Sequence, residues 1–154
     1  MWIRFDRAEP PAPSLPLATP AGSPVAVADF YGRASLVLFF AHAGDCPACL
    51  AWRRHLAAES ERYRELGAEA LVIVPEAADG DAGRAPRVLV DRGNTLRERY
   101  AALMTPAAPG GVMVFILNEQ GAPQAAWLGP DAPTGTVGEE LATRLQHAAL
   151  ACPE

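Results

Sequence analysis

Cys46 and Cys49 are the two residues of this chain whose type and spacing point most directly to chemistry. They stand three positions apart in the tetrapeptide Cys46-Pro47-Ala48-Cys49. A thiolate, rather than a thiol, is the nucleophile in disulfide exchange. Two thiols one helical turn apart can divide the work, because the first attacks a substrate and the second then attacks the mixed disulfide. We therefore take Cys46 as the candidate nucleophile and Cys49 as the resolving thiol.

A strand and a helix are predicted on either side of the cysteine pair. Residues 35–40 form a continuous apolar run, which is typical of a central strand covered on both faces. From residue 47 to about residue 66, apolar side chains recur at helical spacing, and proline suits the first turn of that helix. Cys46 therefore falls at a helix N-terminus, where unpaired backbone N–H groups and the positive end of the helix dipole favour a thiolate. In this context a CxxC motif is a more specific sign of thiol chemistry than the motif alone.

The rest of the chain alternates predicted strands and helices. Apolar runs predict strands at residues 70–74, 88–91, 112–117 and 125–128, and helical periodicity predicts helices at residues 95–103 and 137–150. Six of the 15 prolines lie between Pro10 and Pro24, where short apolar stretches at residues 15–17 and 25–27 flank a turn and predict an edge hairpin. This order of elements indicates an α/β domain with a central mixed β-sheet flanked by helices and an N-terminal extended hairpin.

The length and composition indicate one domain that spans residues 1–154. A chain of 154 residues is within the usual range for a single domain. We expect residues 1–12 to form an extended N-terminal arm, because its proline-rich end cannot be helical, and residues 151–154 to form a C-terminal tail. Three cysteines are too few for a small scaffold stapled by disulfides.

The charge balance excludes several classes of partner. Eighteen acidic residues stand against thirteen basic residues, all of them arginine, and the formal net charge is −5. No basic stripe is present to bind nucleic acid or an anionic membrane, and Arg53 and Arg54 are predicted to lie on a solvated helix face. The N-terminal sequence lacks the basic and apolar regions of a secretory leader, so we expect a cytoplasmic protein. No GxGxxG motif follows a predicted strand, so we expect no organic cofactor and an external thiol as electron donor.

Several stretches follow one another in an order typical of a known superfamily. The run at residues 36–40 leads into the cysteine motif, and matching stretches follow at residues 63–69, 70–74, 90–91 and 115–121. The chain resembles the thioredoxin-like redoxin superfamily, which includes peroxiredoxins of the alkyl hydroperoxide reductase and thiol-specific antioxidant type and membrane-tethered thiol-disulfide reductases. The resemblance covers about residues 13–150. It implies a thioredoxin-like fold and a thiol-dependent oxidoreductase whose substrate is a protein disulfide, a small-molecule disulfide or a peroxide.

Two positions depart from the patterns of the best-known branches. Peroxiredoxins carry a threonine or serine just before the peroxidatic cysteine, whereas Ala43 stands three residues before Cys46. Thioredoxins place a cis-proline before the strand that corresponds to residues 112–117, whereas this chain has Gly111 and then Val112. Both activities therefore stay open. Our leading interpretation is a disulfide oxidoreductase, and the alternative is a thiol peroxidase that reduces hydroperoxides.

Five residues are candidates to support the two cysteines. Asp45 directly precedes the nucleophile, and its carboxylate disfavours a second negative charge there. A protonated His42 that points at the nucleophile would have the opposite effect. Pro47 fixes the first helical turn. The resemblance places Gly111 and Val112 where the cis-proline would hold the backbone of the partner.

Metal binding is a second alternative. His42, Cys46 and Cys49 supply nitrogen and sulfur ligands of the kind that zinc and copper accept. No second CxxC follows, and His55 is too far along the helix axis to join easily, so we expect no metal. A binding module that kept the fold without the chemistry is a third class. We expect Cys152 to be a surface thiol near the C-terminus rather than a resolving residue.

Overall fold

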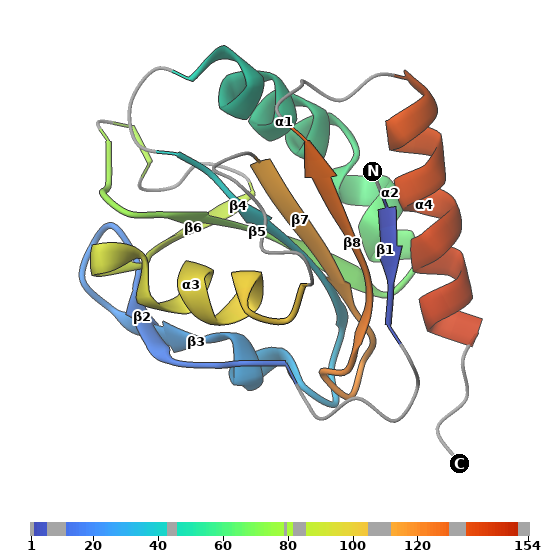
Figure 1. Ribbon diagram of the computed structural model, residues 1–154, viewed down its shortest axis with the longest axis horizontal. Coiled ribbons are helices and arrows are strands. Elements are labelled where there is room, and N and C mark those ends of the chain that lie inside the picture. The colour runs from blue at the N-terminus through green and yellow to red at the C-terminus, as the bar shows by residue number, and fades with distance from the viewer. Residues whose placement is uncertain are drawn as a thin grey trace.

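A computed structural model gives an α/β fold built around one mixed sheet (Figure 1). The structure describes residues 2–5, 12–42, 46–78, 80–81, 86–104, 112–129 and 135–150. Within these residues, eight strands lie in the spatial order β1-β8-β7-β4-β5-β6-β2-β3. Their bounds are β1 Trp2–Arg4, β2 Pro16–Ala18, β3 Pro24–Ala26, β4 Ser35–Phe40, β5 Ala68–Val74, β6 Arg87–Val90, β7 Val112–Leu117 and β8 Pro123–Gly129.

The parallel strands β4, β5 and β6 form the middle of the sheet. Leu38 pairs with Leu71 of β5, and Ile73 of β5 pairs with Leu89 of β6. Antiparallel strands extend this group on both sides, with β7, β8 and β1 beside β4 and the β2–β3 hairpin beside β6. Because parallel strands end at the same edge of a sheet, the segments that follow β4, β5 and β6 begin side by side. This edge carries the cysteine pair.

Strand β4 is buried on both faces, as its continuous apolar run predicts. Val37 and Phe39 belong to the apolar core on one face of the sheet. Leu36, Leu38 and Phe40 belong to the core on the other face. Successive side chains of a strand point to opposite faces, so a strand with a core on each side is apolar nearly throughout, as β4 is from Leu36 to Phe40. The position at which β4 ends is therefore tightly fixed.

Helices cover both faces of the sheet (Figure 1). Three of them, α1 (Pro47–Ala58), α2 (Ser60–Glu65) and α4 (Gly135–Leu150), lie on one face, and α3 (Thr95–Ala101) lies on the other beside the β2–β3 hairpin. Trp52 of α1 stacks on Phe39 with ring centroids 5.9 Å apart, and its ring lies 5.4 Å from that of Trp127. Each aromatic pair of this kind adds about 0.5–1.5 kcal/mol beyond its buried area. These contacts fix α1, and with it the cysteines, against the sheet.

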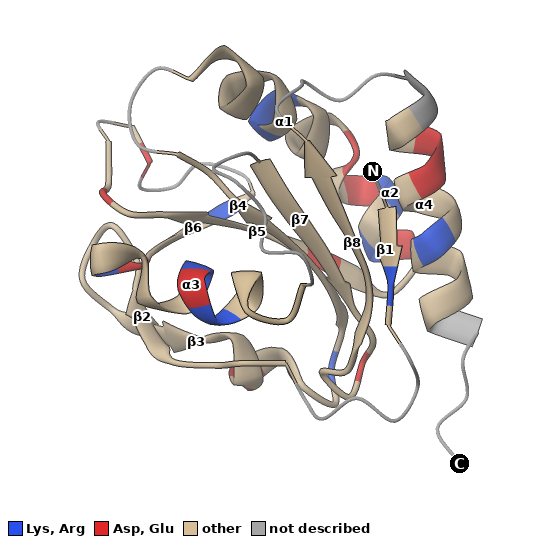
Figure 2. Ribbon diagram, in the orientation of Figure 1, with Lys and Arg blue, Asp and Glu red and all other residues tan. Residues whose placement is uncertain are grey.

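Charged residues are concentrated on the helices and the connecting segments (Figure 2). Strands β4, β7 and β8 contain no charged residue. In the described part of the chain, no helix has the length and the apolar character that crossing a bilayer requires.

The helix predicted from residue 47 to about residue 66 is divided in two at Glu59. The backbone of Glu59 has φ −94° and ψ 1°, outside the helical region, and α2 starts directly after it. Ser60 Oγ donates a hydrogen bond to the carbonyl of Leu56 at 3.0 Å. Leu56 and Tyr63 are both buried in the same core, so the apolar periodicity continues across the break. For this reason the sequence predicts one helix where there are two.

The predicted N-terminal arm contains a short strand that the sequence did not predict. Trp2–Arg4 forms β1, which pairs antiparallel with β8, so that Trp2 lies opposite Trp127. Three residues are too few to show the alternation that identifies a strand, and the partner lies at the far end of the sequence. Residues 6–11 of the arm and the predicted tail at residues 151–154 lie outside the described residues. The predicted edge hairpin is present as β2 and β3.

Asp91 directly follows β6, and its carboxylate holds the beginning of α3. Its Oδ1 accepts a hydrogen bond from the N–H of Leu96, and its Oδ2 accepts one from the N–H of Arg97, both at 3.0 Å. Asp91 is 3% exposed. The two bonds satisfy N–H groups that the first helical turn leaves unpaired. Asp91 therefore fixes both the start of α3 and the position of Arg97.

We expect Asp91→Ala to lower the free energy of unfolding by about 1–3 kcal/mol, because a buried N–H group and a partly buried one lose their acceptors. Urea titration followed by circular dichroism measures the change. Glu98→Ala is the matched control, since Glu98 is an exposed acid on the same helix; it should change stability by no more than about 0.5 kcal/mol. Equal stability of the two variants would contradict the capping role of Asp91.

Candidate active site

Cys46 and Cys49 lie where the end of β4 leads into α1. Cys46 is the N-cap residue of α1, with φ −58° and ψ 115°, and Pro47 occupies the first turn as predicted. The carbonyl of Cys46 accepts a hydrogen bond from the N–H of Leu50 at 3.1 Å, which starts the helical ladder. Cys46 is half-buried, whereas Cys49 is only 3% exposed. One thiol is therefore accessible, and the other is packed beneath it.

The start of the helix favours the thiolate of Cys46. The pKa of Cys46 lies below its ordinary value of 9.0, chiefly because the backbone N–H of Cys49 donates a hydrogen bond to its sulfur. The side chain of Cys49 and the backbone N–H of Ala48 act in the same direction, and partial burial opposes them. Donors fixed at a helix N-terminus lower a thiol pKa in this way.

Cys49 has the opposite electrostatic character. The pKa of Cys49 is raised to about 11, chiefly because the thiol is buried and also because of the nearby sulfur of Cys46. The backbone N–H of His42 and the guanidinium of Arg97 lower it in part. Cys46 is therefore the more acidic thiol of the pair, and the first proton to leave comes from Cys46 rather than from Cys49. A nucleophile and a resolving thiol require this asymmetry.

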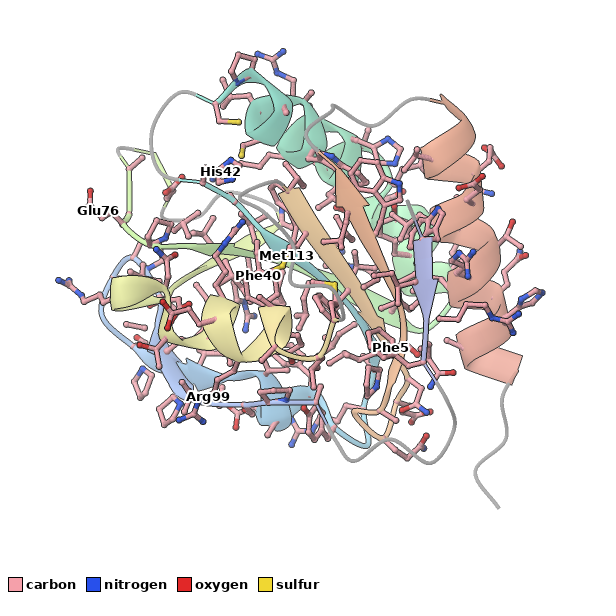
Figure 3. The ribbon with its side chains drawn as sticks, in the orientation of Figure 1. Phe5, Phe40, His42, Glu76, Arg99 and Met113 are labelled. Atoms are coloured by element: carbon pink, nitrogen blue, oxygen red, sulfur yellow. The ribbon has the colours of Figure 1, made fainter. Side chains whose placement is uncertain are left out.

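His42 contacts the buried thiol. Its backbone N–H donates a hydrogen bond to Cys49 Sγ at 3.3 Å, and its Nδ1 lies 3.7 Å from the same sulfur. Figure 3 shows His42 just past the end of β4, beneath the first turn of α1. The sequence suggested that His42 acts on Cys46, whereas the closest sulfur contact that the structure gives it is with Cys49. The ligand atoms of His42, Cys46 and Cys49 all lie within 4.8 Å of one another.

The remaining predicted site residues are only partly described. Val112 is fully buried at the start of β7 and belongs to the same core cluster as Cys49. Asp45 and Gly111 lie outside the described residues, as do Ala43 and Cys152. His55 lies outside the group formed by the cysteines and His42, as the helix geometry predicts. Its ring faces Gly138 of α4 and packs edge-on against Trp52.

Arg97 is a functional candidate that the sequence analysis missed. It is half-buried, and its Nη1 donates a hydrogen bond to the carbonyl of Phe40 at 3.1 Å, at the end of β4. Burial lowers the pKa of Arg97, while Cys49 and Asp91 raise it. A guanidinium held in this position stabilises negative charge on the buried sulfur. The parallel order of β4, β5 and β6 could have indicated it, because that order brings the residues after β6 to the cysteine edge.

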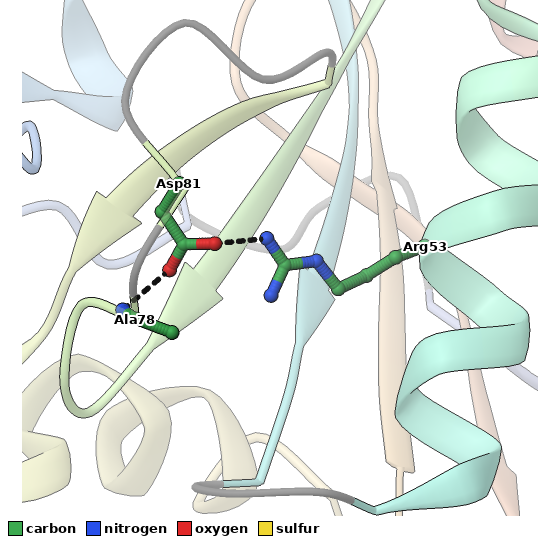
Figure 4. Close-up of polar contacts among 3 residues, drawn as sticks. All are labelled: Arg53, Ala78 and Asp81. Carbon is green, nitrogen blue, oxygen red and sulfur yellow. Dashed lines mark hydrogen bonds and ion pairs between the residues drawn. The ribbon is translucent and has the colours of Figure 1, made fainter.

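Arg53 does not lie on the solvated face predicted for it. Its Nη2 lies 2.6 Å from Asp81 Oδ1, and Asp81 Oδ2 accepts a hydrogen bond from the N–H of Ala78 at 2.8 Å (Figure 4). The side chain of Asp81 is fully buried and that of Arg53 is 14% exposed. Arg54, by contrast, is exposed as predicted. The ion pair ties the segment after β5 to the helix that carries the cysteines.

Comparisons with known proteins identify the fold. No family model matches the sequence. No curated protein is detectably similar to it in sequence.

Several solved structures match nearly the whole chain. Peroxiredoxin Q of Xanthomonas campestris matches with a TM-score of 0.69 and 18% identity over 88% of this chain and 92% of that chain. A thiol:disulfide interchange protein of the thioredoxin family from Chlorobium tepidum matches with a TM-score of 0.71 and 17% identity over 94% of this chain and 99% of that chain. Peroxidoxin BcpB of Mycobacterium tuberculosis matches with a TM-score of 0.71 and 15% identity over 94% and 97%. The likeness establishes a thioredoxin-like α/β fold, which confirms the fold that the sequence resemblance predicts.

We expect iodoacetamide to modify Cys46 of the reduced protein at pH 7 at least about tenfold faster than Cys49, because Cys46 is accessible and has the lowered pKa, whereas Cys49 is buried and has the raised one. The rate at Cys46 should rise with pH through a midpoint below 9.0, since the thiolate forms above the lowered pKa. Timed alkylation of a Cys152→Ser protein, followed by peptide mass spectrometry, measures both sites. Equal rates at Cys46 and Cys49 would disprove the asymmetry.

We expect Asp81→Asn to lower the free energy of unfolding by about 2–4 kcal/mol, because it leaves the guanidinium of Arg53 without its buried counter-charge. Arg53→Met should also destabilise, and the double variant should be more stable than the sum of the two losses implies, by about 1–3 kcal/mol. Arg54→Met is the matched control and should be nearly neutral. Additive losses in this double-mutant cycle would show that the two side chains do not interact.

Proposed function

We propose that this protein is a thiol-disulfide oxidoreductase in which Cys46 is the nucleophile and Cys49 the resolving thiol. The observation that carries the proposal is the pairing of an accessible sulfur at a helix N-terminus, with a lowered pKa, and a buried sulfur one turn later, with its pKa raised to about 11. The thioredoxin-like fold and its thiol-dependent structural neighbours support the same reaction class.

The reaction begins at Cys46. Its thiolate attacks one sulfur of a substrate disulfide, the S–S bond of the substrate breaks, and the departing sulfur takes up a proton as a thiol. Cys49 then loses its proton and attacks Cys46 Sγ, which releases the second substrate sulfur. The protein now holds a Cys46–Cys49 disulfide and the substrate has gained two electrons. An external thiol must reduce that disulfide before the next cycle.

The surroundings of Cys49 support the second step. While Cys46 is a thiolate, its charge and its hydrogen bond raise the pKa of Cys49. Once Cys46 is part of a mixed disulfide, that charge is gone, whereas the N–H of His42 and the guanidinium of Arg97 still favour a thiolate at Cys49. Formation of the mixed disulfide therefore makes the resolving thiol more acidic. The first step thereby prepares the second.

A protein substrate is consistent with the surface beside the site. Leu50 follows Cys49 on the first turn of α1 and is 36% exposed. Among the described residues it is the large apolar side chain that counts as exposed. An apolar side chain next to a nucleophile offers a contact to an extended segment of a partner protein. The cytoplasmic location and the use of an external thiol as electron donor stay predictions.

Hydroperoxide reduction is the alternative activity. In that reaction the thiolate of Cys46 attacks the O–O bond and becomes a sulfenic acid, and Cys49 then forms the disulfide with release of water. Peroxiredoxins are among the structural neighbours. However, the chain has Ala43 where those enzymes carry a hydroxyl side chain. We therefore place disulfide exchange first.

We expect Cys46→Ser to abolish reduction of a disulfide substrate, because serine is not ionised at neutral pH. Cys49→Ser should instead accumulate a covalent Cys46–substrate adduct, since the resolving sulfur is absent. Non-reducing electrophoresis and intact mass spectrometry of the two variants with insulin or a small-molecule disulfide measure both outcomes. Cys152→Ser is the control and should behave like the unmodified protein.

Parallel assays with hydrogen peroxide and an alkyl hydroperoxide distinguish the two activities. Rapid peroxide turnover with little disulfide reduction would favour the peroxidase. Undiminished disulfide reduction by Cys46→Ser would exclude Cys46 as the nucleophile of the proposed reaction.

A further inference from the structure

Three side chains with soft or imidazole ligand atoms converge beneath the first turn of α1. His42 comes from the end of β4, and Cys46 and Cys49 come from the beginning of the helix. Their ligand atoms lie within 4.8 Å of one another, and they form the one such group of three or more in the part of the chain that the structure describes. In Figure 3, His42 lies between the sheet edge and the helix. Disulfide exchange needs the two sulfurs but does not need an imidazole nitrogen facing one of them.

The spacing of these atoms matches the ligands of a single metal ion. With metal–sulfur bonds of about 2.3 Å and a metal–nitrogen bond of about 2.0 Å, three ligands in a plane lie about 3.7–4.0 Å apart. His42 Nδ1 and Cys49 Sγ are 3.7 Å apart. Since no pair exceeds 4.8 Å, closing the remaining distances takes movements of about 1 Å or less. Cys46 is half-buried at the start of the helix, so its side chain has room to make that movement.

The ligand set favours Cu(I) over zinc. Thiolates are soft ligands that select Cu(I) and zinc, and imidazole suits both metals. A structural zinc site is normally closed by four protein ligands, whereas the described residues offer three here, and Cu(I) accepts a three-coordinate site. Two thiolates and one Cu(I) carry a net charge of −1, which the guanidinium of Arg97 near Cys49 stabilises.

A hydrogen bond to Cys49 Sγ comes from the backbone of His42 and not from its imidazole ring. The backbone N–H of His42 donates this hydrogen bond at 3.3 Å. This hydrogen bond therefore does not use a nitrogen atom of the imidazole ring. Hydrogen bonds to coordinating groups hold them in place and tune the site. One residue therefore supplies both a ligand atom and a supporting hydrogen bond.

We propose that the reduced protein binds one Cu(I) ion through His42 Nδ1, Cys46 Sγ and Cys49 Sγ. Binding displaces the thiol protons, and the copper remains monovalent, so no electron donor or acceptor is needed. Formation of the Cys46–Cys49 disulfide removes both thiolates and releases the ion. Copper binding and disulfide exchange are therefore alternative states of one site, and this inference goes beyond the proposed oxidoreductase activity.

Anaerobic titration of the reduced full-length protein with Cu(I), with bicinchoninate as competing chelator, tests the proposal. We expect one tightly bound Cu(I) per chain and none in the oxidised protein. His42→Ala and His42→Asn should each weaken binding about tenfold or more, and Cys46→Ser and Cys49→Ser should weaken it further. His147→Ala is the matched control, because His147 is an exposed histidine of α4, and it should bind like the unmodified protein. X-ray absorption at the copper edge should show two sulfur neighbours and one nitrogen neighbour.

Unchanged Cu(I) affinity in both folded His42 variants would overturn the proposal, because any close dithiol binds Cu(I) to some degree. A spectrum with sulfur neighbours alone, or one copper per two chains, would overturn it as well. Circular dichroism verifies that each variant is folded. Copper binding without disulfide reduction would refute the proposed oxidoreductase alone, and disulfide reduction without His42-dependent copper binding would refute the copper site alone.

Discussion

The burial of β4 on both faces is the constraint on which the rest of the site depends. A strand that packs Val37 and Phe39 into one core and Leu38 and Phe40 into another cannot shift its register without exposing apolar side chains. Its end is therefore fixed relative to β5 and β6, which run parallel to it. The groups that matter at the site follow these strand ends. His42 comes after β4, Asp81 after β5, and Asp91 with Arg97 after β6. Each would lie elsewhere if the central strand could slide.

Around the two sulfurs, burial and hydrogen bonding act in opposite directions, and their balance differs between the two positions. Cys46 receives backbone N–H donors at a helix N-terminus while it remains partly accessible, so stabilisation of its thiolate exceeds the cost of burial. Cys49 receives the N–H of His42 and the field of Arg97, but it is almost completely buried, and burial dominates. The fold thus makes two unlike thiols from one short motif. The position of each sulfur relative to solvent and to the helix start is the cause.

Hydrophobic patterning and the position of proline were enough to predict where the cysteine motif lies in the fold. The apolar run of β4 and the proline after Cys46 place the motif between a strand and a helix, as observed. The break at Glu59 could not be predicted, because Leu56 and Tyr63 continue one apolar stripe across it. Arg97 and the Arg53–Asp81 pair were missed for another reason. Their partners are far away in the sequence, and charged residues on a helix are usually solvated. Only the order of the strands brings them to the cysteines.

The difference in burial between the two sulfurs also sets which reagents can reach them. A disulfide carried by a protein or a bulky molecule meets Cys46 alone, because Cys49 is 3% exposed. In the reaction that we propose, the order of the two exchange steps is thereby imposed by access as well as by pKa. A bare cation is small enough to lie among Cys46, Cys49 and the imidazole of His42, whose ligand atoms are within 4.8 Å of one another. In the two roles that we propose, the size of the reagent therefore decides whether the pair acts as a nucleophile with a resolving thiol or as a single chelating unit. The redox state decides whether either role is open.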